Sequence, residues 1–163
     1  MCACVCVALL GACGREAKPD KTHVDATPRD SERVVTAPRD SDSVDAAVDV
    51  VRSYYAAIDA GSYRTAYRLW EGDGTATGQS YDQFVAGFAH TRRVAAELGT
   101  PGPLGAAAGS RYVEVPVTIR ATTDRDETQR FAGSLVVRRA VADGATEAQR
   151  RWHLYSAAVK RVR

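Results

Sequence analysis

The sequence predicts an α+β fold in which three helices pack against a mainly antiparallel sheet. Between residues 44 and 88, apolar side chains recur at three- and four-residue spacing, which is typical of helices that bury one face. From about residue 90 to the end, apolar and polar side chains alternate, as they do in strands. We expect three segments: residues 1–13 as an export signal, residues 14–43 as a tether and residues 44–163 as one domain.

The amino terminus has the pattern of an exported, lipid-modified protein. Residues 3–10 are apolar, and they are followed by the sequence Leu10-Gly11-Ala12-Cys13 and then by Gly14. This segment resembles the lipobox of bacterial lipoproteins, in which the cysteine thiol receives a diacylglycerol and cleavage makes that cysteine the new amino terminus. The resemblance implies lipidation of Cys13 and a protein of the cell envelope that faces the periplasm. Gly14, in place of aspartate, implies delivery to the outer membrane.

Other interpretations of the amino terminus suit its residues less well. A membrane-spanning helix needs about 20 apolar residues, and charges begin here at Arg15. A signal cleaved without lipidation needs an A-x-A-like site, whereas the small residues here lead directly into cysteine. The spacing of Cys2, Cys4 and Cys6 does not suit a zinc site, so no metal is expected. No lysine or arginine precedes the apolar run, which leaves open a start codon farther upstream.

Residues 14–43 are predicted to be a disordered tether. They are rich in Pro, Asp, Arg, Ser and Thr and have almost no large apolar side chains, so they cannot bury enough surface to offset the entropy lost on ordering. The sequence Pro28-Arg29-Asp30-Ser31 recurs as Pro38-Arg39-Asp40-Ser41, and two copies favour a duplicated spacer over a repeat fold. A flexible chain of this length spans on the order of 30 Å.

Three helices are predicted in the first part of the domain. Ser43 or Asp42 caps the first helix, Ser62 caps the second, and Ser80 with Gln83 forms a capping box at the third. A brief strand is predicted for residues 75–77, within a glycine-rich stretch. The side chains expected to be buried are Val44, Ala47, Val48, Val51, Tyr55 and Ile58 in the first helix, Tyr63, Ala66, Tyr67 and Trp70 in the second, and Phe84, Val85 and Phe88 in the third.

Strands are predicted from residue 93 to the end. The first covers residues 93–98 and is followed by a loop over residues 99–109. Residues 112–120 alternate clearly, and Pro116 among them indicates an edge or a bulge, because proline cannot donate a backbone hydrogen bond. A charged turn over residues 124–127 leads to a strand through Phe131, Leu135 and Val137, and a closing strand covers residues 151–162.

Three segments of the domain resemble nuclear transport factor 2-like domains. Residues 50–61 are VVRSYYAAIDAG, residues 63–70 are YRTAYRLW and residues 151–155 are RWHLY. The resemblance covers about residues 44–163, and its motifs are mostly core positions. It implies a curved sheet that wraps around three helices to form a cone with an open pocket.

Enzymes of this fold, such as ketosteroid isomerases and polyketide cyclases, place an acidic base on or near the short first strand. Aligning residues 69–75 with the isomerase pattern puts Gly78 where the base belongs, so the base is missing. Glu71 and Asp73 lie nearby, in a glycine-rich turn where solvated loop carboxylates are expected. We therefore predict no catalytic residue and no cofactor, and an isomerase- or cyclase-type enzyme remains the alternative.

Seven side chains are candidates to line the pocket, and the five that lie on predicted strands do so only if their strand faces point into the cone. Alternation alone does not decide this, since the final strand is apolar on both sides, and a satisfied structural role is the competing interpretation. His90, at the predicted end of the third helix, is interpreted as a histidine favoured by the helix dipole. The candidates are Tyr55, Trp70, Tyr112, Glu114, Arg120, His153 and Tyr155.

Charge and composition restrict the partners. The net charge of +2 and the absence of aromatic residues between the basic pairs argue against nucleic acid as a partner. The favoured function is a membrane-anchored, non-catalytic envelope module that binds a small apolar ligand or another envelope protein, with homodimerisation left open. A structural spacer, whose cone would be filled by its own side chains, is a further alternative.

Overall fold

The computed structural model describes residues 42–163. The predicted signal segment, Cys13 and the tether up to residue 41 lie outside the described residues. No helix within residues 42–163 is long and apolar enough to cross a membrane. The elements, in chain order, are α1 (Val44–Asp59), α2 (Tyr63–Arg68), the 3-10 helix η1 (Thr75–Thr77), α3 (Tyr81–Ala86), β1 (Thr91–Leu98), β2 (Gly105–Ala107), β3 (Ser110–Thr123), β4 (Thr128–Ala140), α4 (Glu147–Arg150) and β5 (His153–Val162).

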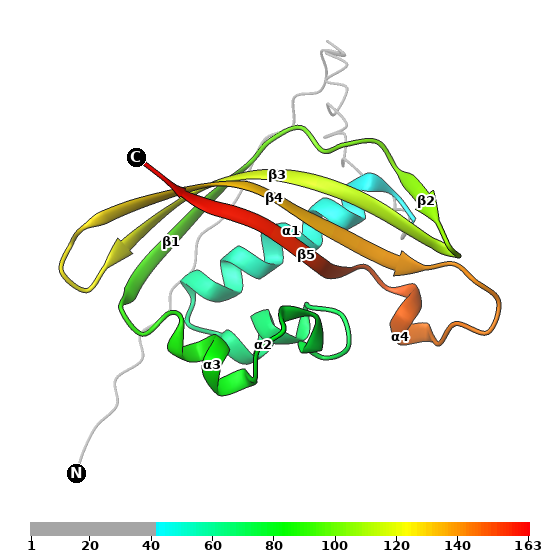
Figure 1. The fold of residues 1–163 in the computed structure, drawn as a ribbon, viewed down its shortest axis with the longest axis horizontal. Helices are drawn as coiled ribbons and strands as arrows, with labels where there is room; N and C mark the ends of the chain where they lie inside the picture. The colour runs from blue at the N-terminus through cyan, green and yellow to red at the C-terminus, as the bar shows by residue number, and fades with distance from the viewer. Residues whose placement is uncertain (1–41) are drawn as a thin grey trace, which may run out of the picture. The chain divides into compact units, whose positions relative to one another are not determined.

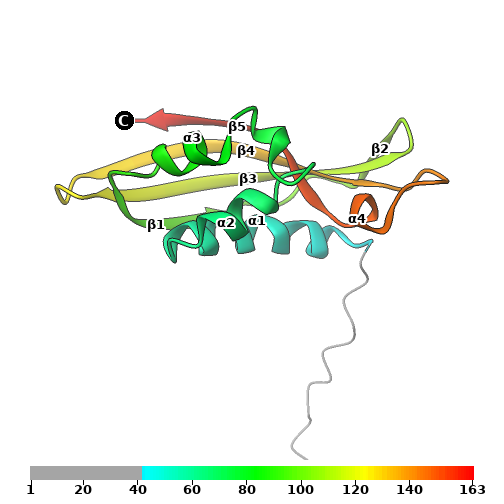
Figure 2. The same cartoon turned by 90° about the horizontal axis from the view of Figure 1, so that it is seen from below.

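The strands form one antiparallel sheet in the order β1-β3-β4-β5, with the short β2 paired to β3. Figure 1 shows the long strands arching over α1, with α2 and α3 below it, and Figure 2 shows the same arrangement from below. The predicted α+β architecture with an antiparallel sheet is therefore confirmed. The short helix α4, between β4 and β5, was not predicted.

The first helix begins where its sequence predicts. Ser43 is the N-cap, and its Oγ accepts a hydrogen bond from the Ala46 N–H at 3.1 Å. The most buried side chains include Ala47, Val51 and Tyr54, which recur at the spacing of one helix face. Tyr54, rather than the predicted Tyr55, therefore lies on the core stripe, and Tyr55 is half-buried beside it.

Residues 75–77 are a 3-10 helix, so the predicted strand is wrong. Gly74 and Gly78 flank this segment, and both have positive φ angles. Glycine adopts this backbone conformation readily, and it allows a tight turn at each end of the segment. The Thr77 hydroxyl donates to the Gly74 carbonyl at 2.7 Å. Local turns therefore satisfy backbone groups that a strand would have to pair with a neighbour.

The capping box of the third helix is confirmed. Ser80 Oγ accepts from the Gln83 N–H at 3.3 Å, and Gln83 Oε1 accepts from the Ser80 N–H at 2.9 Å. The helix ends at Ala86, so His90 lies in a turn beyond it and not at the helix terminus. His90 Nδ1 instead lies 2.8 Å from Asp124 Oδ2, and the imidazole is largely exposed.

Alternation along β3 sets the two faces of the sheet. Val113, Val115, Val117 and Ile119 are buried, and the residues between them are exposed. The buried set packs with Leu135, Val137 and Leu154 and with the helices, and we call this the inner face. The even-numbered residues of β3 and their register partners form the opposite, outer face.

Pro116 lies in β3, an interior strand, and the strand pairing has no register shift at this residue, so the predicted edge or bulge is wrong. β1 ends at Leu98, opposite Val117, and β2 begins only at Gly105. The Pro116 carbonyl accepts from the Gly99 N–H at 2.9 Å, so the proline nitrogen faces the gap between β1 and β2, where a loop crosses. β2 itself lies inside the segment predicted to be entirely loop.

Candidate functional site

A cavity of about 260 Å³ lies between α1, the turn after α3 and the inner face of the sheet. This volume is near the lower end of the range for small-molecule pockets, roughly 300 to 1,000 Å³. Most of its lining is aliphatic or aromatic. The lining residues are Tyr54, Tyr55, Ile58, Gly87, Phe88, Thr91, Val94, Ile119, Ala121, Gln129, Phe131 and Val159.

Two adjacent tyrosines supply most of the polarity of the cavity. The rings of Tyr54 and Tyr55 meet edge to face, with centroids 5.0 Å apart. Burial raises the pKa of Tyr54 to about 12. Burial, together with the neighbouring Tyr54, raises the pKa of Tyr55 as well. Both phenols therefore stay protonated at neutral pH and can donate hydrogen bonds, and Thr91 and Gln129 add one hydroxyl and one amide.

A second hollow of about 300 Å³ adjoins the cavity and shares Tyr54, Gly87 and Phe88 with it. Trp70 lines this hollow and contacts Tyr54 edge to face, with ring centroids 5.9 Å apart. Trp70 Nε1 is buried and has no partner of hydrogen-bonding geometry within residues 42–163. The neighbouring indole nevertheless lowers the pKa of Tyr54, against the larger effect of burial.

The lining of the cavity combines apolar side chains with a few neutral polar groups. It contains no carboxylate, imidazole, thiol or amine. Residues 42–163 also hold no cluster of three or more metal-ligating side chains. A general base must be able to accept a proton near the working pH, and neutral phenols, hydroxyls and amides do not meet this condition. The cavity therefore offers shape, apolar surface and hydrogen-bond donors.

The predicted pocket residues fall into two groups. Tyr55 lines the cavity and Trp70 lines the adjoining hollow. Tyr112, Glu114 and Arg120 are even-numbered residues of β3 and lie on the outer face, away from the cavity. Tyr155 packs edge to face against Tyr112 there, with ring centroids 5.9 Å apart, and His153 is the register partner of Arg138, itself paired with Tyr112.

The candidates that do not line the cavity have structural partners. Glu114 Oε1 accepts from the Ser134 hydroxyl at 2.6 Å, and Arg120 lies 3.1 Å from Glu97. His153 Nδ1 lies 2.9 Å from the Arg151 carbonyl oxygen. Each contact joins neighbouring strands or residues two apart in the sequence, which is consistent with a structural role.

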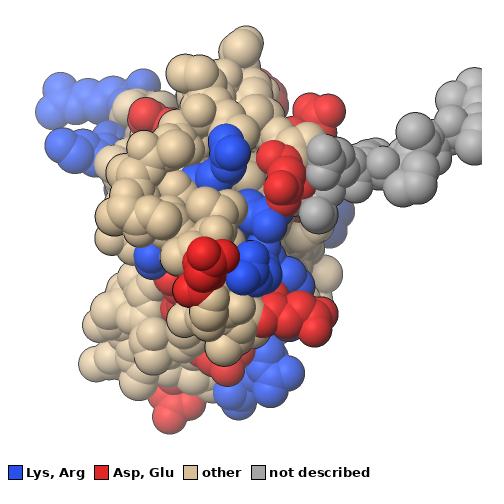
Figure 3. Space-filling view, turned by 90° about the vertical axis from the view of Figure 1, so that its right-hand side faces the viewer, with Lys and Arg blue, Asp and Glu red and all other residues tan. Residues whose placement is uncertain are grey.

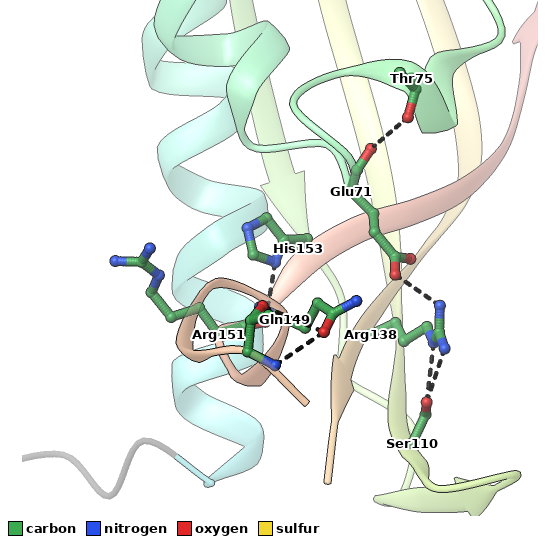
Figure 4. Close-up of polar contacts among 8 residues, drawn as sticks. Glu71, Thr75, Ser110, Arg138, Gln149, Arg151 and His153 are labelled. Carbon is green, nitrogen blue, oxygen red and sulfur yellow. Dashed lines mark hydrogen bonds and ion pairs between the residues drawn. The ribbon is translucent and has the colours of Figure 1, made fainter. Parts of the chain in front are cut away.

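Glu71 has a partner on the sheet. Figure 4 shows its carboxylate reaching Arg138, with an N–O distance of 2.6 Å, while the same guanidinium donates to Ser110 Oγ at 2.9 and 3.1 Å. The guanidinium also lies over the Tyr155 ring, 5.4 Å from its centroid. Burial lowers the pKa of Arg138, but the hydrogen bond and charge of Glu71 outweigh it and raise the pKa overall, so the ion pair persists.

Backbone pairing fixes Glu71 at this position. Its N–H donates to the Leu154 carbonyl at 2.9 Å, and the Leu154 N–H donates to the Leu69 carbonyl at 2.8 Å. Residues 69–71 thus run beside the edge of β5, through a parallel bridge between Trp70 and Leu154. Backbone pairing therefore holds Glu71 at the edge of the sheet. Gly78, which aligns with the isomerase base, caps η1 and has no side chain that could act as a base.

The cavity also contains residues that were not proposed as candidates. Ile119 and Ala121 lie on the buried face of β3, and Gln129, Phe131 and Val159 complete the lining from β4 and β5. The continuous apolar series at odd positions from Val113 to Ile119 is the sequence signal that would have identified this face as the inner one. Gln129 has no such signal, because it stands alone in a polar stretch.

Comparison with known proteins supports the fold. No protein-family model and no curated protein sequence matches this chain. A crystal structure of a protein from Streptomyces avermitilis, assigned to the nuclear transport factor 2-like family and provisionally named a dehydratase, matches with a TM-score of 0.51 and 16% sequence identity. The match covers 77% of this chain and 99% of that chain. The described part of this chain therefore has the nuclear transport factor 2-like fold.

Proposed function

We propose that residues 44–163 form a non-catalytic module that holds a small apolar ligand in the cavity between α1 and the sheet. The observation that carries this proposal is the lining itself, in which aliphatic and aromatic side chains surround two protonated phenols. Sites of this kind gain affinity from apolar burial and orientation from a few hydrogen bonds.

The two alternatives fit the cavity less well. An isomerase- or cyclase-type enzyme needs a titratable group in the pocket with a partner in reach, and the lining supplies only phenols with raised pKa values. A purely structural spacer would fill its cone with its own side chains, whereas a volume of about 260 Å³ is left open. The name given to the Streptomyces avermitilis protein does not change this preference, since the likeness extends to the fold alone.

We further propose that lipidation of Cys13 anchors this module to the envelope membrane, facing the periplasm. The support is the sequence Leu10-Gly11-Ala12-Cys13, together with the low apolar content of the tether that follows. An anchor of two or more acyl chains holds a protein stably at a bilayer, whereas one chain gives marginal binding.

Ligand binding is tested by filling the cavity. Ala121 is buried and lines it, whereas Ala95 is exposed on the outer face and is the register partner of Arg120. We expect 1-octanol to bind the full chain in a calorimetric titration, Ala121→Leu to weaken binding about tenfold or more, and Ala95→Leu to leave it unchanged. Equal binding by the native chain and Ala121→Leu would mean that the cavity is not the site.

Anchoring is tested at the thiol. Cys13→Ser should move the protein from the membrane fraction to the soluble fraction and abolish incorporation of labelled palmitate. Cys6→Ser is the matched control, because it alters another cysteine of the same apolar segment and leaves the lipobox intact. Retention of Cys13→Ser in the membrane, with palmitate still incorporated, would refute the anchor.

A further inference from the structure

A basic hollow adjoins the ligand cavity at the ends of β4 and β5. It measures about 700 Å³ and is lined by Thr128, Gln129, Arg130, Arg161, Val162 and Arg163. Gln129 also lines the ligand cavity, so the two spaces meet at this side chain. The C-terminal end of β5 and the β3–β4 turn lie at the same end of the sheet (Figure 1).

Strand register continues the inner face from the cavity into the hollow. Val159 lines the cavity and pairs with Gly133, and Arg161 pairs with Phe131, which also lines the cavity. Alternate residues of a strand share a face, so Arg161 projects on the same side as Val159, about 7 Å farther along β5. Arg163 lies just beyond the end of β5 and also lines the hollow. The inner face of β5 therefore changes from apolar at Val159 to cationic at Arg161.

The cations of this hollow are exposed and uncompensated. Arg130, Arg161 and Arg163 are exposed, and none of them takes part in an ion pair within the part of the chain that the structure describes. A smaller hollow that also shares Gln129 has charges of both signs, with Asp124 and Glu127 beside His90 and Arg125. An anion that enters beside Gln129 is therefore attracted toward β5, because every charged side chain of the larger hollow is an arginine.

The opposite end of the domain lacks this separation of charge. Figure 3 shows acidic and basic side chains adjoining one another on the end where α1 begins. There Arg139, which is buried, pairs with Asp42. Exposed arginines outside the ion pairs also occur elsewhere on the domain, among them Arg68, Arg125 and Arg151, but Arg130, Arg161 and Arg163 are the ones that line the hollow beside the cavity.

We propose that the ligand is an anionic amphiphile, whose apolar body occupies the cavity and whose carboxylate or phosphate head lies against Arg161 and Arg163. This inference rests on the proposed ligand-binding function and specifies its ligand class. Guanidinium groups bind carboxylate and phosphate through charge-assisted, often bidentate hydrogen bonds. Gln129, between the two spaces, offers an amide to the oxygen atoms at the junction of head and body.

Three probes separate the contributions of head and body: octanoate carries both, 1-octanol carries the body alone, and acetate carries the head alone. Each is titrated calorimetrically into the full chain, below its critical micelle concentration. We expect octanoate to bind about fivefold more tightly than 1-octanol at low salt, because two exposed arginines contribute modestly. This preference should shrink as salt is added, and acetate should show no measurable binding.

Variants assign the preference to the hollow. The double variant Arg161→Gln/Arg163→Gln should bind 1-octanol as the native chain does and lose the preference for octanoate. Arg68→Gln is the matched control, since Arg68 is exposed on α2 and lines none of these spaces.

The titrations of the native chain distinguish failure of this inference from failure of the proposed function. If 1-octanol binds but octanoate binds no better, the amphiphile inference fails and the proposed apolar site is retained. If neither binds, the proposed function fails. If acetate alone binds as tightly as octanoate, the hollow is an independent anion site and the inference fails.

Octyl phosphate distinguishes the two head groups. Binding tighter than that of octanoate supports a phosphate head, and weaker binding supports a carboxylate head. Loss of this difference in the double variant places the head at the arginines, and its persistence there would contradict that placement.

Discussion

Tyr54 and Tyr55 are successive residues on α1, yet both line the cavity. Tyr54 is only 7% exposed and completes the core stripe, whereas Tyr55 packs against it from the side. A phenolate in either position would lose most of its hydration, which is why burial raises both pKa values. The cavity is thus lined by hydrogen-bond donors that keep their protons across the physiological range.

Stability at high pH reports this burial. Because the folded pKa of Tyr54 is about 12 and the unfolded value is about 10, the folded state holds more protons between these values. The unfolding free energy should be constant up to about pH 10 and then fall as pH rises toward 12, by at most about 1.4 kcal/mol per pH unit for each buried phenol. Denaturant titrations between about pH 8 and about pH 12 measure the slope of the unfolding free energy with pH.

Phenylalanine variants identify the groups responsible. Tyr54→Phe should reduce the slope, and Tyr155→Phe, which alters a tyrosine that is 43% exposed on the outer face, should not. An identical alkaline decline in the native chain and Tyr54→Phe would show that this phenol is not the titrating group.

Glu71 offers a second test at the residue scale. Its ion pair with Arg138 is partly buried, and the guanidinium also binds Ser110. Glu71→Gln should lower the unfolding free energy by about 1 kcal/mol, allowing for the exposed part of the pair. Glu97→Gln removes the charge from the more exposed pair with Arg120 and should cost close to zero. If urea titrations gave the same loss of unfolding free energy for both variants, the Glu71–Arg138 ion pair would contribute no more to stability than the exposed pair.

The sequence located part of the candidate site. It selected Tyr55 and Trp70 because aromatic residues stood at helical core positions. Tyr112, Glu114 and Arg120 were misplaced, although the apolar odd positions of β3 already indicated that the opposite face is buried. The packing of α1 on those odd-numbered residues leaves Tyr112, Glu114 and Arg120 on the outer face. For β5 the ambiguity was real, because apolar residues stand on both of its faces and a period of two does not say which one the helices cover.

At the scale of elements, local chemistry predicted helices better than short segments. The N-cap of α1 and the capping box of α3 were found because their hydrogen bonds join residues close in sequence. η1 and β2 were missed for the opposite reason. A three-residue segment has too few side chains to show a period, and β2 exists because β3 lies beside it.

Gly133 controls how closely β4 and β5 approach. A Cβ atom there would lie 2.0 Å from the Ala158 carbonyl oxygen and 2.7 Å from the Val159 Cα, both of which are backbone atoms that cannot turn aside. Gly133→Ala should therefore lower the unfolding free energy by at least about 2 kcal/mol, measured by denaturant titration. Gly102→Ala is the control, because its new Cβ would meet nothing closer than 3.6 Å. A loss of less than about 0.5 kcal/mol for Gly133→Ala would contradict this account.

At the scale of the molecule, the helices are too short to cover the whole inner face of the curved sheet. α2 and α3 have six residues each, so they cover only part of the inner face that α1 does not reach. The cavity forms where this cover ends, beside Phe88 and Val94. Its existence is a property of the assembled sheet and helices, which no single segment of the sequence encodes.

A ligand that fills this space should stabilise the whole domain, because only the folded state has the cavity. At a free concentration of about 100 times its dissociation constant, 1-octanol should raise the unfolding free energy of the native chain by about 2.7 kcal/mol. Ala121→Leu occupies the cavity with its own side chain and should show little of this gain, whereas Ala95→Leu should show all of it. Thermal or denaturant unfolding at several ligand concentrations gives the measurement. The same stabilisation in Ala121→Leu and the native chain would mean that the alcohol acts through the solvent or on another surface. The cavity would then not be the binding site.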